Sequence, residues 1–342
     1  MSISRRTLIA SSAALAVAGC NKKPLAFTFA VSSPVWWNPV PIVAERRAAL
    51  KNKGFDLKIL SLESGAKVRQ SVASGAAALG VASTNAFTTA SDAELQNLRI
   101  LASITHTSAM VAILARIAEP GELMKGRIGY TPGTMSELYL IAFLQKSLQI
   151  ELYSRKELLL VPLDPPGIVA AFQRGDIDVA VTWEPYASQI AAGTVFMTPS
   201  ISNVGQTDGE GADAVAGPPA APVSAQAPAE IRDQSLYAQN IFVFASTSAL
   251  QTQKPQVDAA LGGLKATCEW IGANRMQAAR ELEAVFRDQR ISIAANPLWN
   301  TVAVEFNPSQ TMIHEALLRD HQLGVLAGIG RATMNGLSVL TI

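Results

Sequence analysis

Short strand-like patterns alternate with helical patterns along most of the chain, and this alternation constrains the fold more than any other feature. In the first series, strands are predicted at 25–31, 55–60, 76–82 and 99–105. A second series begins after Pro120-Gly121, with strands predicted at 127–131, 157–163 and 177–182. Such alternation is typical of a mainly parallel sheet flanked by helices, with ligand loops at the carboxyl ends of the strands. The sequence therefore predicts an α/β fold with two similar lobes.

Helical periodicity fills the intervals between these strands. Helices are predicted at 38–54, 65–75, 134–148 and 166–175, in two stretches from Pro255 to Phe286, and from Pro308 to about Leu326. The helix at 134–148 is apolar almost all round, so we expect it to be buried.

Residues 198–235 interrupt the pattern, because they lack periodicity and are rich in Pro, Gly, Ala and Ser. We interpret them as a flexible surface insertion, with a mobile lid as the functional alternative. A strand is predicted to follow at 240–246.

The N-terminus has the pattern of an export signal, predicted over residues 1–19. Arg5 and Arg6 precede an apolar stretch from Leu8 to Ala18 that is too short to span a bilayer. The Ser4–Ile9 run resembles a twin-arginine signal, and Val17-Ala18-Gly19-Cys20 resembles a bacterial lipobox, in which Cys20 would be lipidated. A buried helix with an incidental cysteine is the structural alternative.

Charge and cysteine content narrow the possible partners and chemistry. The net charge is +1, and no Lys/Arg cluster interleaves with aromatic residues, which argues against nucleic-acid binding and favours a small-molecule partner. The chain has two cysteines, Cys20 and Cys268. If Cys20 carries lipid, neither an intramolecular disulfide nor a thiolate metal site can form, and Cys268 is predicted to be an inert core thiol. We expect no cofactor and no metal site.

Several stretches together resemble one protein family. They are Gly54-Phe55-Asp56-Leu57, SGAKVRQSVASGAAALGVAS, LMKGRIGYTPGT, Gln173 to Asp178, WEPYA and EWIGANRMQAAR. In these stretches the chain is similar to the periplasmic substrate-binding proteins of ABC importers for sulfonates, taurine, nitrate and thiamine-precursor pyrimidines. The resemblance runs from about Leu25 to Leu326, apart from the insertion.

The resemblance implies a two-lobe periplasmic-binding-protein fold of type II that closes on its ligand about a two-segment hinge. Residues 24–112 and 247–342 would form one lobe and 113–246 the other, with 109–116 and 241–246 as the crossings. The expected protein is a monomer without enzymatic activity, anchored by lipid to a bacterial membrane on its periplasmic or extracytoplasmic side. It would deliver a sulfonate, nitrate, aromatic acid or pyrimidine-like solute to an ABC permease.

Candidate ligand residues lie where the predicted strands end. From the first lobe they are Trp36, Trp37, Asn38, Ser83, Thr84, Asn85, His106 and Thr107, and from the second Gly133, Thr134, Trp183 and Glu184. Short hydroxyl and amide side chains with helix N-terminal N–H groups suit an oxyanion, and tryptophans supply an apolar wall.

Each of these candidates has a structural alternative. Ser83 and Thr84 are equally compatible with helix capping, and His106 with a structural hydrogen bond. Of the adjacent Trp36 and Trp37, we expect one to line the cleft, because two neighbouring side chains seldom face the same way. Glu184 could pair with a basic residue across the hinge. Thr134 to Glu137 fits a capping box, in which Glu137 would bond the Thr134 backbone and compete with an anion there.

Two further functions remain open from the sequence. Some relatives on this fold are enzymes, either a sulfinate desulfinase with a Cys/His pair or a pyrimidine synthase with a Cys-rich segment and a self-consuming histidine. Here there are three histidines, His106, His314 and His321, and no nucleophile-base-acid arrangement is visible. A sensing lipoprotein cannot be separated from a transport component by sequence.

Overall fold

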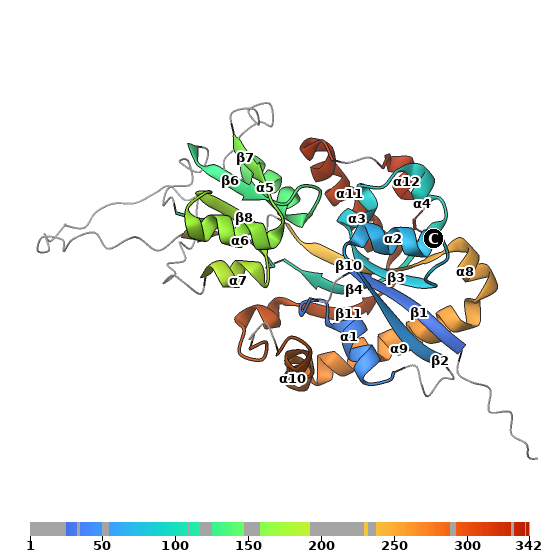
Figure 1. Ribbon diagram of the computed structural model, residues 1–342. Helices are drawn as coiled ribbons and strands as arrows, with labels where there is room; N and C mark the ends of the chain where they lie inside the picture. The colour runs from blue at the N-terminus through green and yellow to red at the C-terminus, as the bar shows by residue number, and fades with distance from the viewer. Residues whose placement is uncertain are drawn as a thin grey trace, which may run out of the picture.

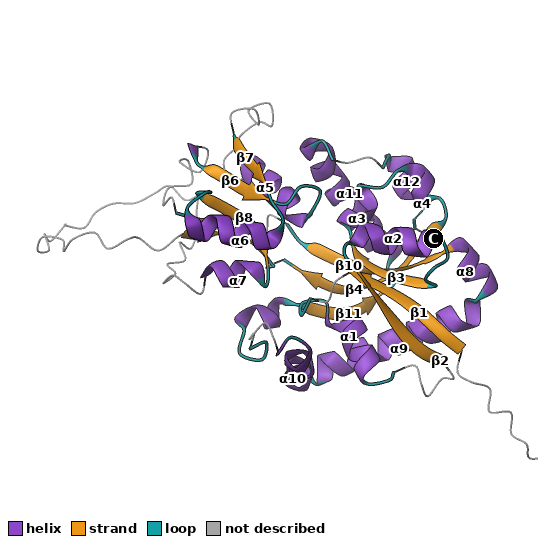
Figure 2. Ribbon diagram, in the orientation of Figure 1, coloured by secondary structure: helices purple, strands orange, loops and turns teal. Residues whose placement is uncertain are grey.

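The computed structural model describes residues 25–32, 35–49, 55–108, 110–116, 125–146, 158–191, 229–231, 237–287, 292–329, 332–338 and 340–341. Within these residues, two β-sheets with their own helices form two lobes (Figure 1). Helices cover both faces of each sheet (Figure 2). The two-lobed α/β fold class is therefore confirmed.

The first lobe contains a six-stranded sheet in the order β11-β4-β10-β3-β1-β2. Its strands are β1 (Leu25–Ser32), β2 (Phe55–Leu62), β3 (Leu79–Ser83), β4 (Leu98–Thr107), β10 (Gln239–Ser246) and β11 (Ala303–Asn307). Successive side chains of β10 point to opposite faces of the sheet, as the period of two in a strand requires. Val243 packs with helices α1, α9 and α10, whereas Phe242 and Phe244 pack with α2, α3 and α11.

The helices of this lobe include those predicted at 65–75, 255–286 and 308–326, whereas the helix predicted at 38–54 ends at Arg46 and four short helices were not predicted. The helices described in this lobe are α1 (Pro39–Arg46), α2 (Gly65–Ala73), α3 (Asn85–Thr88), α4 (Asp92–Leu95), α8 (Thr247–Thr252), α9 (Lys254–Ala273), α10 (Arg275–Val285), α11 (Gln310–Ala327) and α12 (Met334–Ser338). A 3-10 helix, Pro297–Thr301, precedes β11.

The second lobe contains a five-stranded sheet in the order β7-β6-β8-β5-β9. Its elements are β5 (Val111–Ala115), β6 (Arg127–Tyr130), α5 (Met135–Lys146), β7 (Leu159–Pro162), α6 (Pro165–Arg174), β8 (Val179–Trp183), α7 (Tyr186–Ala191) and β9 (Ala229–Ile231). On β5, Ile113 packs toward α5, and Ala112 and Leu114 pack toward α6 and α7. Helix α5 is buried, as its apolar composition predicts.

Both sheets mix parallel and antiparallel strands, which refines the expected mainly parallel arrangement. Strand β10 is antiparallel to β3 and β4, and β5 is antiparallel to β8 and β9. The reason is topological: the chain enters each of these strands from the other lobe, so it starts at the inner edge of the sheet and runs outward.

The register of these strands positions the site. Val111, the first residue of β5, pairs with Trp183, the last of β8. Gln239, the first residue of β10, pairs with Thr107, the last of β4. The carboxyl ends of the parallel strands in both sheets therefore face the crossings. The segments 109–116 and 241–246, expected to be the crossings, are largely β5 and β10 themselves, and the chain passes between the sheets just before each.

Two features differ from the sequence-based expectation, and a third prediction falls outside the described residues. Strand β9 lies inside the expected insertion 198–235 and pairs with β5, so that segment is not wholly without structure. Strand β11 was not predicted. The expected signal 1–19 and Cys20 lie outside the described residues. Among the helices described here, none has the length and apolar character needed to cross a membrane.

Candidate functional site

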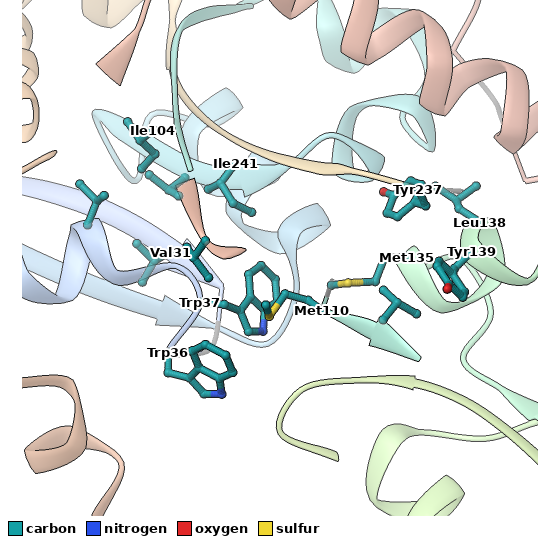
Figure 3. Close-up of a cluster of buried hydrophobic side chains, with 14 of the residues drawn as sticks. Val31, Trp36, Trp37, Ile104, Met110, Met135, Leu138, Tyr139, Tyr237 and Ile241 are labelled. Atoms are coloured by element: carbon teal, nitrogen blue, oxygen red, sulfur yellow. The ribbon is translucent and has the colours of Figure 1, made fainter. Parts of the chain in front are cut away.

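Aromatic and thioether side chains from both lobes meet where the strand ends face one another. We call the set Trp36, Trp37, Met110, Met135, Tyr139 and Tyr237 the junction cluster; all six are buried. Trp36 and Trp37 follow β1, Met135 and Tyr139 lie on α5, and Tyr237 precedes β10. Figure 3 shows Trp37 beside Met110, with Met135 on the far side of Met110.

Two hydrogen bonds join the lobes at this junction. The indole Nε1 of Trp37 donates to the carbonyl oxygen of Glu184 at 3.1 Å, and this bond is buried. The side-chain amide of Asn85, at the start of α3, donates to the carbonyl oxygen of Gly133 at 3.5 Å. Four of the predicted site residues are thus brought together in pairs across the lobes.

The first turn of α5 is stabilised mainly by its own side chains. Glu137 Oε2 accepts from the backbone N–H of Gly133 at 2.8 Å, and Glu137 is 2% exposed. Thr134 Oγ1 accepts from the N–H of Ser136 at 3.3 Å and donates to the carbonyl of Thr131 at 2.7 Å. The predicted capping box is therefore shifted: Glu137 bonds the Gly133 backbone instead of the Thr134 backbone. Gly133 has φ +71°, a conformation that favours glycine.

The carboxylate of Glu184 faces its own lobe. Its Oε2 accepts from the Ser188 hydroxyl at 2.6 Å and from the Ser188 N–H at 3.3 Å, which tethers it to α7. The bond that Trp37 of the other lobe donates to Glu184 is accepted by its backbone carbonyl. Trp183 is half-buried and meets Tyr186 edge-on, with ring centroids 6.2 Å apart.

The residues at the end of β3 and directly after it have mainly structural contacts. Thr84 is fully buried, and its hydroxyl donates to the Asn240 carbonyl at 3.2 Å. Its side chain makes no capping bond to α3, so helix capping by Thr84 is wrong. Ser83 donates its hydroxyl to the Asn85 side-chain oxygen.

His106 borders a groove whose lining includes no residue of the junction cluster. Its Nδ1 is 3.0 Å from Asn240 Oδ1, in agreement with the structural alternative. This groove, of about 450 Å³, is lined by first-lobe residues, including Glu305, Glu315 and Arg319. Thr107, the next residue on β4, is 1% exposed and points its hydroxyl to no partner among the described residues.

Several buried polar atoms near the strand ends have no hydrogen-bond partner within the described part of the chain. Four of them are Trp36 Nε1, Asn38 Oδ1, Thr131 Oγ1 and Thr182 Oγ1. An unsatisfied buried polar group costs about 1–3 kcal/mol. These atoms are therefore candidate contacts for a bound molecule, with one donor on an indole, one amide acceptor and two hydroxyls.

Sequence reasoning missed the methionines and tyrosines of the junction cluster. Met135 directly follows the predicted Gly133 and Thr134, so its place at the start of a helix that faces the cleft was a usable signal. Tyr237 had none, because it lies beyond the insertion and before its strand.

The thiol of Cys268 is not available for nucleophilic chemistry. It is 3% exposed, and burial raises its pKa to about 12. A thiol with a raised pKa is a poor nucleophile at neutral pH. No group of three potential metal ligands occurs among the residues that the structure describes.

Comparisons with known proteins agree with this architecture. The family described as NMT1/THI5 like matches residues 41–274. The taurine-binding periplasmic protein of Escherichia coli (strain K12) is 27% identical over 208 residues, which span 59% of this chain and 61% of that protein. The match thus covers about three fifths of the length of that relative.

Solved structures share the fold at low identity. The periplasmic aliphatic sulphonate binding protein of Escherichia coli superposes with a TM-score of 0.64 at 13% identity, covering 90% of this chain and 94% of that one. The alkanesulfonate-binding protein of Xanthomonas axonopodis pv. citri, bound to MOPS, gives a TM-score of 0.63 at 14% identity, with coverage of 90% and 95%.

Proposed function

Because the chain belongs to the NMT1/THI5-like family, we propose that it is the extracytoplasmic solute-binding component of an ABC importer. It captures a small solute between its lobes and delivers it to a permease. The observation that carries the proposal is the junction itself, where strand ends from both sheets meet around a buried cluster and are joined by two hydrogen bonds. A taurine-binding relative and sulphonate-binding structures of the same fold support it.

Capture works by hinge closure. The lobes are connected at the ends of β4 and β10, so rotation there opens and closes the junction without disturbing either sheet. We propose that the lobe boundaries lie before β5 and before β10, a few residues earlier than the expected 112/113 and 246/247, because β5 belongs to the second sheet and β10 to the first. The bond from Trp37 to Glu184 forms on closure and is lost on opening.

Ligand binding is tested by a thermal-shift screen of the protein without residues 1–19, against sulfonates, nitrate, aromatic acids, pyrimidines and amines. A ligand at a hundred times its dissociation constant stabilises the folded state by about 2.7 kcal/mol. If no compound class raises the melting temperature, the solute-binding proposal fails.

Closure is tested by tryptophan fluorescence with the solute that the screen returns. Trp36 and Trp37 are buried in the junction, so closure changes their environment. We expect a ligand-dependent emission change that is reduced in Trp37→Phe and retained in full in Trp270→Phe, because Trp270 on α9 stacks against Arg47, the residue after α1, away from the junction cluster. The same emission change in all three proteins would contradict closure at this junction.

Membrane attachment is the second part of the proposal. A lipid-modified Cys20 would anchor the protein, since two or more acyl chains give stable membrane binding. We expect Cys20→Ser to move the protein from the membrane to the soluble extracytoplasmic fraction, and Arg5→Lys with Arg6→Lys to impair twin-arginine export. Membrane association that is unchanged in Cys20→Ser would refute the lipobox.

The protein acts without chemistry in this proposal. The buried Cys268, with its raised pKa, supports binding over a thiol-dependent enzyme. A sensing role differs from transport in its downstream partner: deletion of the gene should abolish uptake of the solute if the protein serves a permease.

A further inference from the structure

We propose that a groove within the first lobe, between helix α11 and strands β11, β4 and β10, is a second ligand site that takes a small organic cation, a primary amine with an apolar body. We call it the α11 groove. Its volume is about 450 Å³, and its lining includes no residue of the junction cluster. A cavity of this size suits a small molecule. The site is distinct from the proposed capture of a solute between the lobes and does not depend on it.

Strand β11 divides its side chains between two environments. Val304 and Phe306 pack against the hydrophobic core on the α9 side of the sheet, whereas Ala303, Glu305 and Asn307 line the α11 groove. This division follows the period of two of a strand. The side of β11 that carries a carboxylate and an amide therefore forms part of the groove floor.

The register extends this polar floor across two more strands. Ala303 is opposite His106 of β4, which is opposite Asn240 of β10. Asn307 is opposite Ser103 of β4. Ser103 and Asn240 both line the groove, although each is only 4% exposed. A helix that packs on a sheet ordinarily covers apolar side chains, so packing alone does not explain these polar positions.

Helix α11 forms the opposite wall with one stripe of its surface. The residues of this stripe that line the groove are Met312, Glu315, Ala316 and Arg319. Their spacing of three and four residues places them on one side of the helix. Ile313 and Leu317, on the adjacent stripe, pack into the core with Phe242 and Phe244. The helix therefore rests on the sheet along one edge and borders the groove along the other.

The charges that line the groove leave two carboxylates available. Glu305 on β11 and Glu315 on α11 are exposed, and neither forms a hydrogen bond or an ion pair with another described residue. Arg319 also lines the groove, but its guanidinium turns to the second crossing, where Nη2 donates to the Ala238 carbonyl oxygen and lies 3.4 Å from Asp320 Oδ1. An ammonium group in the groove would thus meet carboxylates from two different elements.

Ser103 gives an observation that is independent of charge. It is nine-tenths buried, it lines the groove, and its hydroxyl has no hydrogen-bond partner among the described residues. Buried polar groups are normally hydrogen-bonded, and a hydroxyl oxygen can accept a bond from an ammonium group. Met312, Ala303 and Ala316 give the rest of the lining an apolar surface, which favours an organic cation over a metal ion.

A matched pair of probes tests the charge of the ligand. Benzylamine and benzyl alcohol share the ring and the methylene group, but benzylamine is a cation at pH 7. Titration into the nitrogen-15-labelled chain without residues 1–19 should show benzylamine binding about tenfold more tightly, with shifts of the Ser103 and Asn240 backbone amides. A partly exposed charge pair changes affinity by up to about fivefold. Glu305→Gln and Glu315→Gln should each lower the ratio about three- to fivefold, and the double variant should remove it.

Glu45→Gln is the control, since Glu45 is exposed on α1, which packs on the other face of the same sheet. It should leave the ratio unchanged. Equal affinity for the two probes, no binding of benzylamine, or an unchanged ratio in the double variant overturns the inference. Benzylamine shifts at the Trp37 indole and Gly133 without shifts in the groove also overturn it, while the solute-binding function stands. If benzylamine binds in the groove but every compound class fails the thermal-shift screen, this site stands and the proposed function is refuted.

Discussion

Like Asn85, Trp37 uses its side chain to bond the backbone of the second lobe. Its acceptor is the carbonyl oxygen of Glu184, and Trp37 itself is 3% exposed. A backbone acceptor stays the same whatever side chain occupies position 184. The contact therefore depends on the indole of Trp37 and on the distance between the lobes, and not on which side chain occupies position 184.

Trp37→Phe keeps an aromatic ring in the junction but removes the donor. Since a hydrogen bond contributes about 0.5–1.5 kcal/mol net, we expect affinity for the solute to fall about 3- to 10-fold. The melting temperature without ligand should change little if the bond belongs to the closed state. Calorimetric titration and melting curves measure the two effects, with Trp270→Phe as control. A large loss of stability with unchanged affinity would make Trp37 a core residue only.

A buried carboxyl near the second crossing makes stability depend on pH. Asp320 on α11 is fully buried and accepts from the hydroxyl of Tyr237 at 3.0 Å. Burial raises its pKa to about 6, with Arg319 opposing the rise. A carboxyl whose folded pKa is raised binds its proton more tightly in the folded state, so this stabilising contribution is full below about pH 4 and is lost as pH rises through 6.

The loss amounts to roughly 3 kcal/mol at most, since one pKa unit corresponds to about 1.4 kcal/mol. Asp320→Asn cannot titrate, so its stability relative to wild type should increase between pH 4 and pH 7. Denaturant unfolding at several pH values measures this difference, and groups that titrate equally in both proteins cancel. A difference that stays constant with pH would contradict a raised pKa for Asp320.

At the residue scale, positions could be predicted from sequence but side-chain directions could not. Trp37, Asn85, Gly133 and Glu184 were predicted at strand ends, and the fold brings them together across the lobes. The Glu184 carboxylate was expected in the cleft and turns instead to Ser188. That bond depends on how α7 begins, which strand periodicity does not encode.

At the scale of elements, β9 changes what the irregular segment means. Three residues, Ala229–Ile231, pair with β5 and complete the second sheet. A strand this short, surrounded by Ala- and Pro-rich sequence, has too few residues to show alternation. The longer strands were predictable because apolar and polar residues alternate over four or more positions, and this alternation indicates a strand with one buried face.

Deletions test this division of the segment. Replacing residues 199–226 with a short Gly/Ser bridge keeps β9 and should shift the melting temperature by no more than a few degrees. Extending the deletion through residue 231 removes the ladder with β5 and should lower it clearly further. Melting curves of both variants make the comparison. Equal melting of the two deletions would show that β9 adds nothing to stability, and lost binding in the shorter one would favour the lid.

At the scale of the whole molecule, the two crossings run between paired strands. Strands β4 and β10 are neighbours in the first sheet, and β5 and β9 are neighbours in the second. Each lobe therefore anchors both crossings on adjacent strands, which favours rotation of the lobes as rigid bodies. Small-angle scattering should show a smaller radius of gyration with bound solute, and an unchanged radius would contradict closure.

The position of β10 between β3 and β4 also sets the order in which the parts can form. Every strand of the second sheet precedes residue 232, whereas the first sheet lacks an inner strand until residues 239–246 have been made, and its edge strand β11 until residue 307. During synthesis the second sheet can therefore be completed before the first, although its strands begin later in the chain. Strands β3 and β4 pair with β10 only after residues 239–246 have been made, and such pairing between distant segments is slow. Pulse-labelled hydrogen exchange during refolding should protect amides of β6 and β8 before those of β3 and β4. Until β10 has been made, the N-terminal half, with β1, β2 and β3, stays incompletely folded, which leaves time for a chaperone to bind it.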